Sequence, residues 1–259
     1  MKKLSVAIAA GALLASPVFA NDYQAELGLV YGQVDTKLDL GPFGSFDDDA
    51  SSTTLYGEVF FDTVDTSKGP LAEASFLSKS SGLSLSYTTV EDVDDDSWAL
   101  GGRFVFGNDY IIEAGYSSVE DSTSWGAGFG KYLTDSTDLV VSYSTNDDAN
   151  LDTLSADMHS VVSLSGDASL AYTLGLSYLD ADSETGFGIA GDLTYYFNNN
   201  LGIGAGVSQQ SFDSVDITTW QVFADWFVTN NLDLGLSYSD TDMEIIETSM
   251  IAANASFRF

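Results

Sequence analysis

The stretch that decides the fold is S-M-I-A-A-N-A-S-F-R-F, residues 249–259, at the end of the chain. Every second residue from Ile251 to Phe259 is apolar, whereas the residues between them are small or polar. Successive side chains of a β-strand point to opposite faces, so this stretch predicts a strand with one apolar and one polar face. The same two-residue period recurs through most of the chain, which predicts an all-β protein.

The first twenty residues predict that the protein is exported. Two lysines precede an apolar run over residues 4–15, and small residues occupy positions 18 and 20. This order predicts a secretory signal peptide at 1–20, cut before Asn21, and one mature domain at 21–259. Beyond residue 20 no apolar run approaches the roughly 20 residues that a membrane-spanning helix needs. A helical inner-membrane protein is therefore excluded.

The composition favours antiparallel β-structure without covalent cross-links. The 259 residues include no Cys and only 3 Pro, but 24 Gly, 13 Tyr and 16 Phe. Few prolines leave strand ladders unbroken, and aromatic residues are frequent in strands. The formal net charge is −31. A chain this acidic repels nucleic acid, so we expect no nucleic-acid partner.

The terminal strand resembles the closing strand of bacterial outer-membrane β-barrels, whose last residue is typically Phe. Acidic clusters and compact turns alternate between the strands, and the longer loops of such barrels face outside. We therefore place the acidic clusters outside and both chain ends in the periplasm. The prediction is an up-and-down barrel of about fourteen strands, with twelve or sixteen as alternatives, at 22–36, 51–62, 82–90, 97–106, 110–119, 124–133, 137–146, 151–165, 168–180, 185–197, 201–212, 217–228, 232–240 and 247–259.

The segment between residues 63 and 81 lacks the two-residue period of the predicted strands. Between residues 63 and 81, Pro70 opens a run with Ala72, Glu73, Ala74 and Leu77, which favours a helix with proline in its first turn. We expect a short helix near 70–79, or a plug-like insertion, in a periplasmic connection. A strand is the rival interpretation, but it would make the strand count odd, whereas single-chain bacterial barrels have an even number.

The two faces of the strands differ in kind. One face carries aromatic residues at its ends and aliphatic residues between them, which is typical of a lipid-facing surface. A soluble β-sandwich or lipocalin-like barrel, with these faces inside, is the alternative. The other face is rich in glycine and holds most charges. The residues that we predict to line the pore are Glu58, Arg103, Glu113, Asp157, His159, Asp192 and Asp225.

A wide barrel with a polar interior predicts a water-filled pore for small hydrophilic solutes. Carboxylates outnumber basic groups on the inner face, and acidic rings favour cations, so we expect a cation preference. No separate plug domain is evident, and the glycine-rich faces suggest an unsealed interior. Lipid and lipopolysaccharide are expected partners in the outer membrane. The terminal strand ending in Phe259 is expected to engage the barrel-assembly machinery, and the sequence leaves both a monomer and a homo-oligomer open.

The segment G-P-L-A-E-A-S-F-L, from Gly69 to Leu77, is similar to the putative general bacterial porin family of gammaproteobacteria. The resemblance implies an outer-membrane pore and supplies no catalytic residues or cofactors. The chain lacks the long inward-folding constriction loop of the best-known trimeric porins, which sets it apart from them.

Two other classes of function are open from the sequence. A non-conducting barrel for adhesion or envelope integrity would have an interior sealed by salt bridges. A barrel hydrolase would use His159 with Asp157, two residues apart on one face. We expect no enzyme and no cofactor. Acidic runs at 47–49 and 92–96 offer oxygen ligands for calcium, but they lack the spacing of a calcium loop, so no defined metal site is expected.

Overall fold

The computed structural model describes residues 22–91, 96–119, 122–181 and 184–259. The predicted signal peptide lies outside these residues, and so does most of the acidic run at 92–96. In the described residues no helix is long and apolar enough to cross a membrane.

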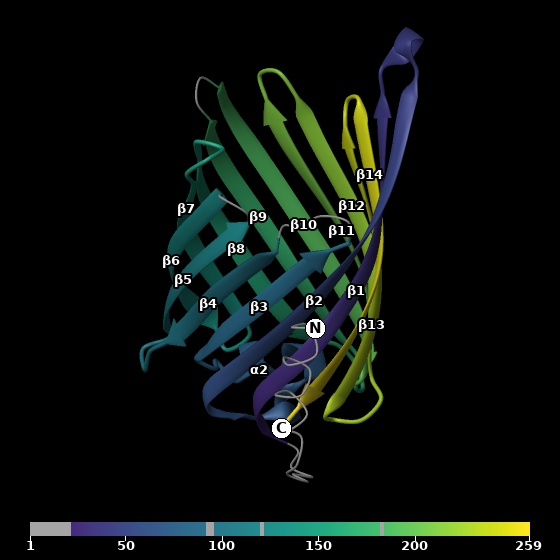
Figure 1. Cartoon of the computed structure of the whole chain (residues 1–259). Helices are drawn as coiled ribbons and strands as arrows, with labels where there is room; N and C mark the ends of the chain where they lie inside the picture. The colour runs from purple at the N-terminus through teal and green to yellow at the C-terminus, as the bar shows by residue number, and fades with distance from the viewer. Residues whose placement is uncertain (1–21, 92–95, 120–121, 182–183) are drawn as a thin grey trace.

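Fourteen antiparallel strands form one closed barrel, in which each strand pairs with its neighbours along the chain (Figure 1). The predicted count is confirmed, and twelve and sixteen are wrong. The strands are β1 (Tyr23–Asp39), β2 (Ser45–Val64), β3 (Gly82–Val90), β4 (Ser97–Val105), β5 (Tyr110–Val119), β6 (Ser122–Thr134), β7 (Thr137–Asn146), β8 (Leu151–Ser163), β9 (Ser169–Ala181), β10 (Glu184–Asn198), β11 (Leu201–Phe212), β12 (Asp216–Phe227), β13 (Leu232–Met243) and β14 (Ile246–Arg258).

The terminal strand closes the barrel, as its alternating pattern predicted. Strand β14 pairs with β1 along thirteen registered positions, from Glu26 opposite Arg258 to Leu38 opposite Ile246. Beyond the strand, Phe259 and Ala25 exchange two backbone hydrogen bonds of 2.9 Å. Closure leaves no sheet edge along this seam, because the backbone groups of β1 and β14 are paired there.

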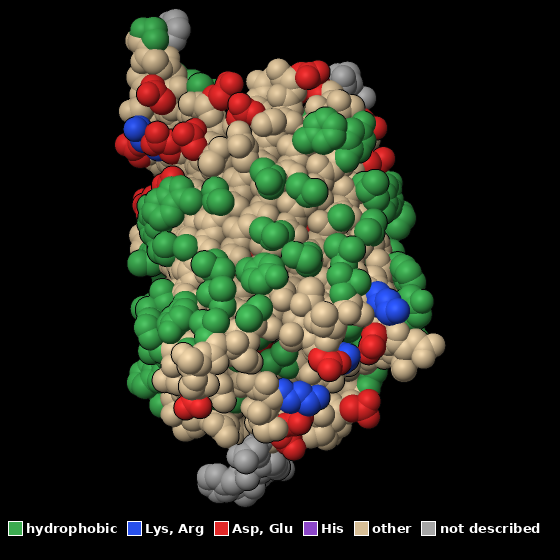
Figure 2. Space-filling view, turned by 180° about the vertical axis from the view of Figure 1, so that it is seen from behind, with side chains coloured by type: hydrophobic (Ala, Val, Ile, Leu, Met, Phe, Trp, Pro, Cys, Tyr) green, Lys and Arg blue, Asp and Glu red, His purple; other side chains and the backbone are tan. Residues whose placement is uncertain are grey.

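The outer surface of the barrel is apolar. Hydrophobic side chains are spread over the middle of the wall, whereas acidic side chains lie toward both ends, beside basic ones at the end away from the projecting hairpin (Figure 2). Phe187, Leu176 and Leu236 are more than 60% exposed, as the lipid-facing prediction requires. The soluble alternative is wrong, because it would turn these apolar faces inward.

The connection between β1 and β2 differs from the prediction. The predicted strands end at residue 36 and resume at residue 51, but both strands continue between these residues into a hairpin that projects beyond the rim (Figure 1). Cross-strand pairing continues to Asp39 and Ser45, and a short 3-10 turn, η1 (Gly41–Phe43), joins them. Gly41 and Gly44 have φ of 60° and 107°, which side chains other than glycine rarely adopt, so the glycines permit this turn.

The connection between β2 and β3, residues 65–81, folds inward and is called the plug here. It contains two 3-10 turns, η2 (Thr66–Lys68) and η3 (Leu71–Glu73), and the four-residue helix α2 (Ala74–Leu77). The prediction of a short helix here is confirmed, and the rival strand is wrong. Each of the three buried apolar clusters in the described residues includes plug side chains, so the packed core lies at the plug end of the barrel.

Candidate functional site: the lumen and its plug

The plug is a compact loop whose two ends are tied together. The Asp65 carboxylate accepts hydrogen bonds from the Ser67 hydroxyl at 2.6 Å and the Ser67 N–H at 2.9 Å. These two bonds hold the pKa of Asp65 below its ordinary value. The Ser78 hydroxyl lies 3.1 Å from both the backbone nitrogen and the backbone oxygen of Asp65. The loop therefore enters and leaves the lumen at one place.

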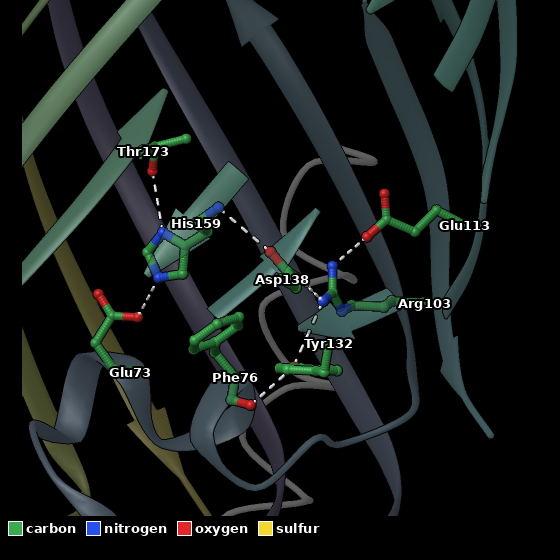
Figure 3. Close-up of polar contacts among 8 residues, drawn as sticks. All are labelled: Glu73, Phe76, Arg103, Glu113, Tyr132, Asp138, His159 and Thr173. Carbon is green, nitrogen blue, oxygen red and sulfur yellow. Dashed lines mark hydrogen bonds and ion pairs between the residues drawn. The ribbon is translucent and has the colours of Figure 1, made fainter. Parts of the chain in front are cut away.

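Glu73 joins the plug to the opposite wall of the barrel. Its Oε2 lies 2.9 Å from Nε2 of His159 on β8, and its Oε1 accepts a 2.9 Å hydrogen bond from the Tyr196 hydroxyl on β10 (Figure 3). The Glu73 side chain is only 13% exposed. A carboxylate this buried requires partners, and here both oxygens have one.

A second polar network begins beside this one. Arg103 on β4 donates to Glu113 on β5 and to Asp138 on β7 (Figure 3). The other oxygen of Asp138 accepts the backbone N–H of His159 at 3.3 Å. Between the two networks, the Phe76 ring packs edge-on against the His159 ring at 4.4 Å, and the Phe76 carbonyl accepts the Tyr132 hydroxyl at 2.8 Å. The networks thus meet at the plug.

Further anchors hold the plug at the rim. Arg258 donates to the Leu71 carbonyl at 2.8 Å and to Glu26 at 2.6 Å, and its guanidinium lies over the rings of Tyr23 and Phe227. These contacts connect the plug to the closing strand.

Lys79 makes the last anchor of the plug. It lies 2.9 Å from Asp109 and 3.0 Å from Asp135, which belong to the turns after β4 and β6. Burial alone would lower the pKa of Lys79, but the two carboxylates outweigh burial and raise it above its ordinary value. Lys79 therefore stays charged at neutral pH and holds the plug to two turns.

Cavities lie on both sides of the plug. On the lumen side, a chamber of 440 Å³ has Ser75, Phe76 and Ser80 of the plug as its floor. It adjoins two further cavities, of 380 and 420 Å³, that follow the inner face of β2 to β7. On the other side, a cavity of 370 Å³ lies against Lys68, Gly69, Pro70 and Leu77. Helix α2 therefore stands between the chamber and the opposite cavity.

The inner glycines do not leave the lumen as open as the sequence suggested. The ring of Tyr56 lies where a Cβ of Gly28 would stand, and the ring of Phe223 lies over Gly204 in the same way. The plug-like insertion expected between residues 63 and 81 is present, but the expectation of an unsealed interior is wrong where these rings stand. The physical reason is that a glycine on one strand gives room to the large inward side chain of its neighbour.

The residues predicted to line the pore fall into two groups. Glu58, Arg103, Glu113, Asp157 and His159 all border the chamber on the plug. Asp192 and Asp225 lie on β10 and β12 and are not among the residues that border it.

The hydrogen bond expected of a hydrolase, between His159 and Asp157, is not formed. The imidazole nitrogens contact Glu73 and Thr173 instead, and Asp157 accepts from the Ser155 hydroxyl at 2.7 Å.

Four residues of the site were missed as site residues from the sequence: Glu73, Tyr132, Asp138 and Tyr196. Glu73 was noted only as a helix former. Two features of the sequence point to Glu73: it is a carboxylate in the irregular connection at 63–81, and the chain has a single histidine, on an inward face, with which it could pair. Asp138 and the two tyrosines share the inward phase of their strands, but phase alone does not say which inward residues touch a plug.

In the described residues, no cluster of three or more acidic or histidine side chains has the geometry to hold a metal ion.

Comparisons with known proteins agree with this architecture. A family model described as "Putative general bacterial porin" matches residues 1–155 and 131–259. The chain is similar to the outer membrane protein Omp33 of Acinetobacter baumannii, with 22% identity and a TM-score of 0.70 over 92% of this chain and 99% of that one. It is also similar to a bacterial polysaccharide outer membrane secretin, with 12% identity and a TM-score of 0.53 over 92% and 99%. At these identities the two structures show the fold alone. No curated protein matches the chain.

Proposed function

We propose that this chain, which belongs to the family of putative general bacterial porins, lets small hydrophilic solutes diffuse passively across the outer membrane. The observation that carries the proposal is the series of adjoining cavities along the inner wall: Glu58 lines all three, and neighbouring cavities have glycines and serines in common. A lumen lined in this way favours water and polar solutes over lipid. The plug narrows the periplasmic exit, so we expect passage to be limited to small solutes.

The lumen also favours cations. Arg103 and Arg258 are each engaged with carboxylates, so their charges are matched locally. Among the described residues, no ion pair involves the inward carboxylates Glu58, Asp157, Asp192 and Asp225. Unmatched negative charge in a narrow, low-dielectric passage raises the local concentration of cations.

Liposome swelling tests the diffusion of solutes. Vesicles that contain the mature protein are diluted at pH 7.5 into isosmotic arabinose, glucose or sucrose. We expect swelling that is faster than in protein-free vesicles and that slows as the solute grows. Heat-denatured protein in the same vesicles is the control. Swelling no faster than in protein-free vesicles would reject the pore and favour a structural or adhesion barrel.

The hydrolase alternative has one geometric argument in its favour. Thr173, His159 and Glu73 form a hydroxyl–imidazole–carboxylate chain. However, Thr173 is not among the residues that border the chamber, and the carboxylate belongs to the plug. Esterase assays of the native protein and of a His159→Gln variant separate the two functions, because the porin proposal expects neither protein to show activity.

A further inference from the structure

His159 is the only histidine of the chain, and solute diffusion does not explain its position. Its Nε2 lies 2.9 Å from Oε2 of Glu73, and its Nδ1 lies 3.0 Å from Oγ1 of Thr173. We propose that His159 is a pH-operated latch that holds the plug more tightly in acid and loosens it as the imidazole loses its proton. This rests on the proposed function, because a latch on the plug matters only if the lumen conducts.

Protonation changes the strength of the latch while its geometry stays the same. An ionised carboxylate can only accept hydrogen bonds, so Nε2 carries a hydrogen toward Glu73 in both states. In the neutral ring Nδ1 accepts from the Thr173 hydroxyl, and in the charged ring it donates to it. Loss of the proton therefore turns an ion pair with a charge-assisted hydrogen bond into a weaker bond from a neutral donor.

The groups around His159 leave the imidazole as the titrating member of the latch near neutral pH. The charged neighbours are Glu73 on the plug, Asp138 on β7, Asp157 on β8 itself and Asp192 on β10; Arg103 is paired with Asp138. Carboxylates ordinarily titrate near pH 4 and guanidinium above pH 12, whereas imidazole ordinarily titrates near pH 6.5. Imidazole is therefore the side chain that switches charge between about pH 5 and 8.

Two other charged side chains that hold the plug, Lys79 and Asp65, keep their charges between pH 5 and 8. Two carboxylates, which outweigh burial, raise the pKa of Lys79, and hydrogen bonds from Ser67 lower the pKa of Asp65. Both groups therefore keep their charges between pH 5 and 8. A pH-dependent change in the hold on the plug over this range then points to His159.

The position of the latch explains how it acts on the passage. Glu73 immediately precedes helix α2, and α2 separates the lumen chamber from the cavity on the other side. Phe76 of α2 also packs on the His159 ring. When the bond to His159 weakens, the middle of the plug loses its hold on β8, while Lys79 still holds the last part of the plug and Arg258 still holds Leu71. We expect the plug to shift without leaving the barrel.

Single-channel recording at pH 5 to 8 tests the latch. In the full mature protein, we expect the open fraction to rise about fivefold from pH 5 to pH 8, the size expected when a charge-assisted hydrogen bond becomes a neutral one. His159→Gln keeps a hydrogen-bond donor without the charge, and Glu73→Gln removes the partner charge, so we expect both variants to lose the pH dependence. Asp152→Asn is the matched control, because it removes a carboxylate from the same strand β8 that bonds to Tyr143 and does not border the chamber, and it should keep the pH dependence.

A second measurement needs no variant. In NMR spectra of the native protein in detergent, the single imidazole should titrate with the same midpoint as the backbone amides of α2. Independent midpoints would overturn the latch, and so would His159→Gln channels that keep the wild-type pH dependence. Conductance that is present but flat with pH refutes the latch alone. The absence of conductance at every pH, in all variants, would refute the pore itself.

Discussion

Gly204 illustrates how single residues shape the lumen. Gly204 on β11 and Gly115 on β5 both occupy positions on the inner face of the barrel, but their surroundings differ. A Cβ at Gly204 would overlap the Phe223 ring and would lie 2.8 Å from the Thr194 hydroxyl, whereas a Cβ at Gly115 would meet only the Leu100 carbonyl at 3.8 Å. The two glycines therefore form a matched pair: one gives room to an aromatic ring and the other borders open space.

We predict that Gly204→Ala destabilises the barrel and that Gly115→Ala does not. Crowding the Phe223 ring should lower the free energy of unfolding by about 1–3 kcal/mol, the usual cost of an added methyl group in a packed site. Gly115→Ala should change it by less than about 0.5 kcal/mol. Urea unfolding in lipid vesicles, followed by tryptophan fluorescence, measures both. Equal effects of the two substitutions would show that the ring does not occupy the space of Gly204.

The elements of the wall were largely predictable, but the contacts of the plug were not. The two-residue period predicted β3, β5, β7 and β11 with the bounds that the structure has. The period is a strong signal because a shift by one residue would move every apolar side chain of a strand to the polar face. The plug has no such period. Its helix α2 is four residues long, and its position depends on Tyr132, His159 and Tyr196 from three distant strands. Such contacts follow from tertiary packing, which a local pattern does not record.

Lys79 gives a prediction at the scale of this element. In Lys79→Met the anchors to Asp109 and Asp135 are lost, so the amides of Ser78 and Ser80 should exchange hydrogen about tenfold faster, as expected for the loss of a charged hydrogen bond. Lys68→Met is the control, because the contacts of Lys68, with the Leu77 carbonyl at 3.5 Å and with Asp65, stay within the plug. Hydrogen-exchange mass spectrometry of the plug peptide compares them, and equal exchange in both variants would contradict the anchor.

The raised pKa of Lys79 determines how the stabilisation of the plug by this lysine depends on pH. The stabilisation from this lysine is fully present below its ordinary pKa of about 10.4 and is lost as the pH rises through the higher value in the folded protein. Protection of the plug by Lys79 should therefore be constant from pH 5 to pH 9. Of the two side chains Lys79 and His159 that hold the plug by ion pairs, His159 is therefore the one that we expect to change charge near neutral pH.

At the scale of the whole molecule, two groups of acidic side chains bear on the passage of ions. One is the hairpin end, where acidic side chains gather on the outside of the barrel (Figure 2). The other is the lumen, where Glu58, Asp192 and Asp225 form no ion pair among the described residues. In the cation-preferring pore that we propose, both regions would act in the same direction: the first would attract cations to the entrance, and the second would stabilise them in the lumen.

The reversal potential under a salt gradient is the measurement that tests this account most directly. The mature protein is inserted into a planar bilayer at pH 7.5, between 0.1 M and about 1 M KCl, a gradient within which charges are screened over roughly 3–10 Å. We predict stable conductance and a reversal potential of the sign set by potassium, with a preference that increases at lower salt. A reversal potential of the sign set by chloride, or no conductance, would contradict the proposal of a cation-preferring porin.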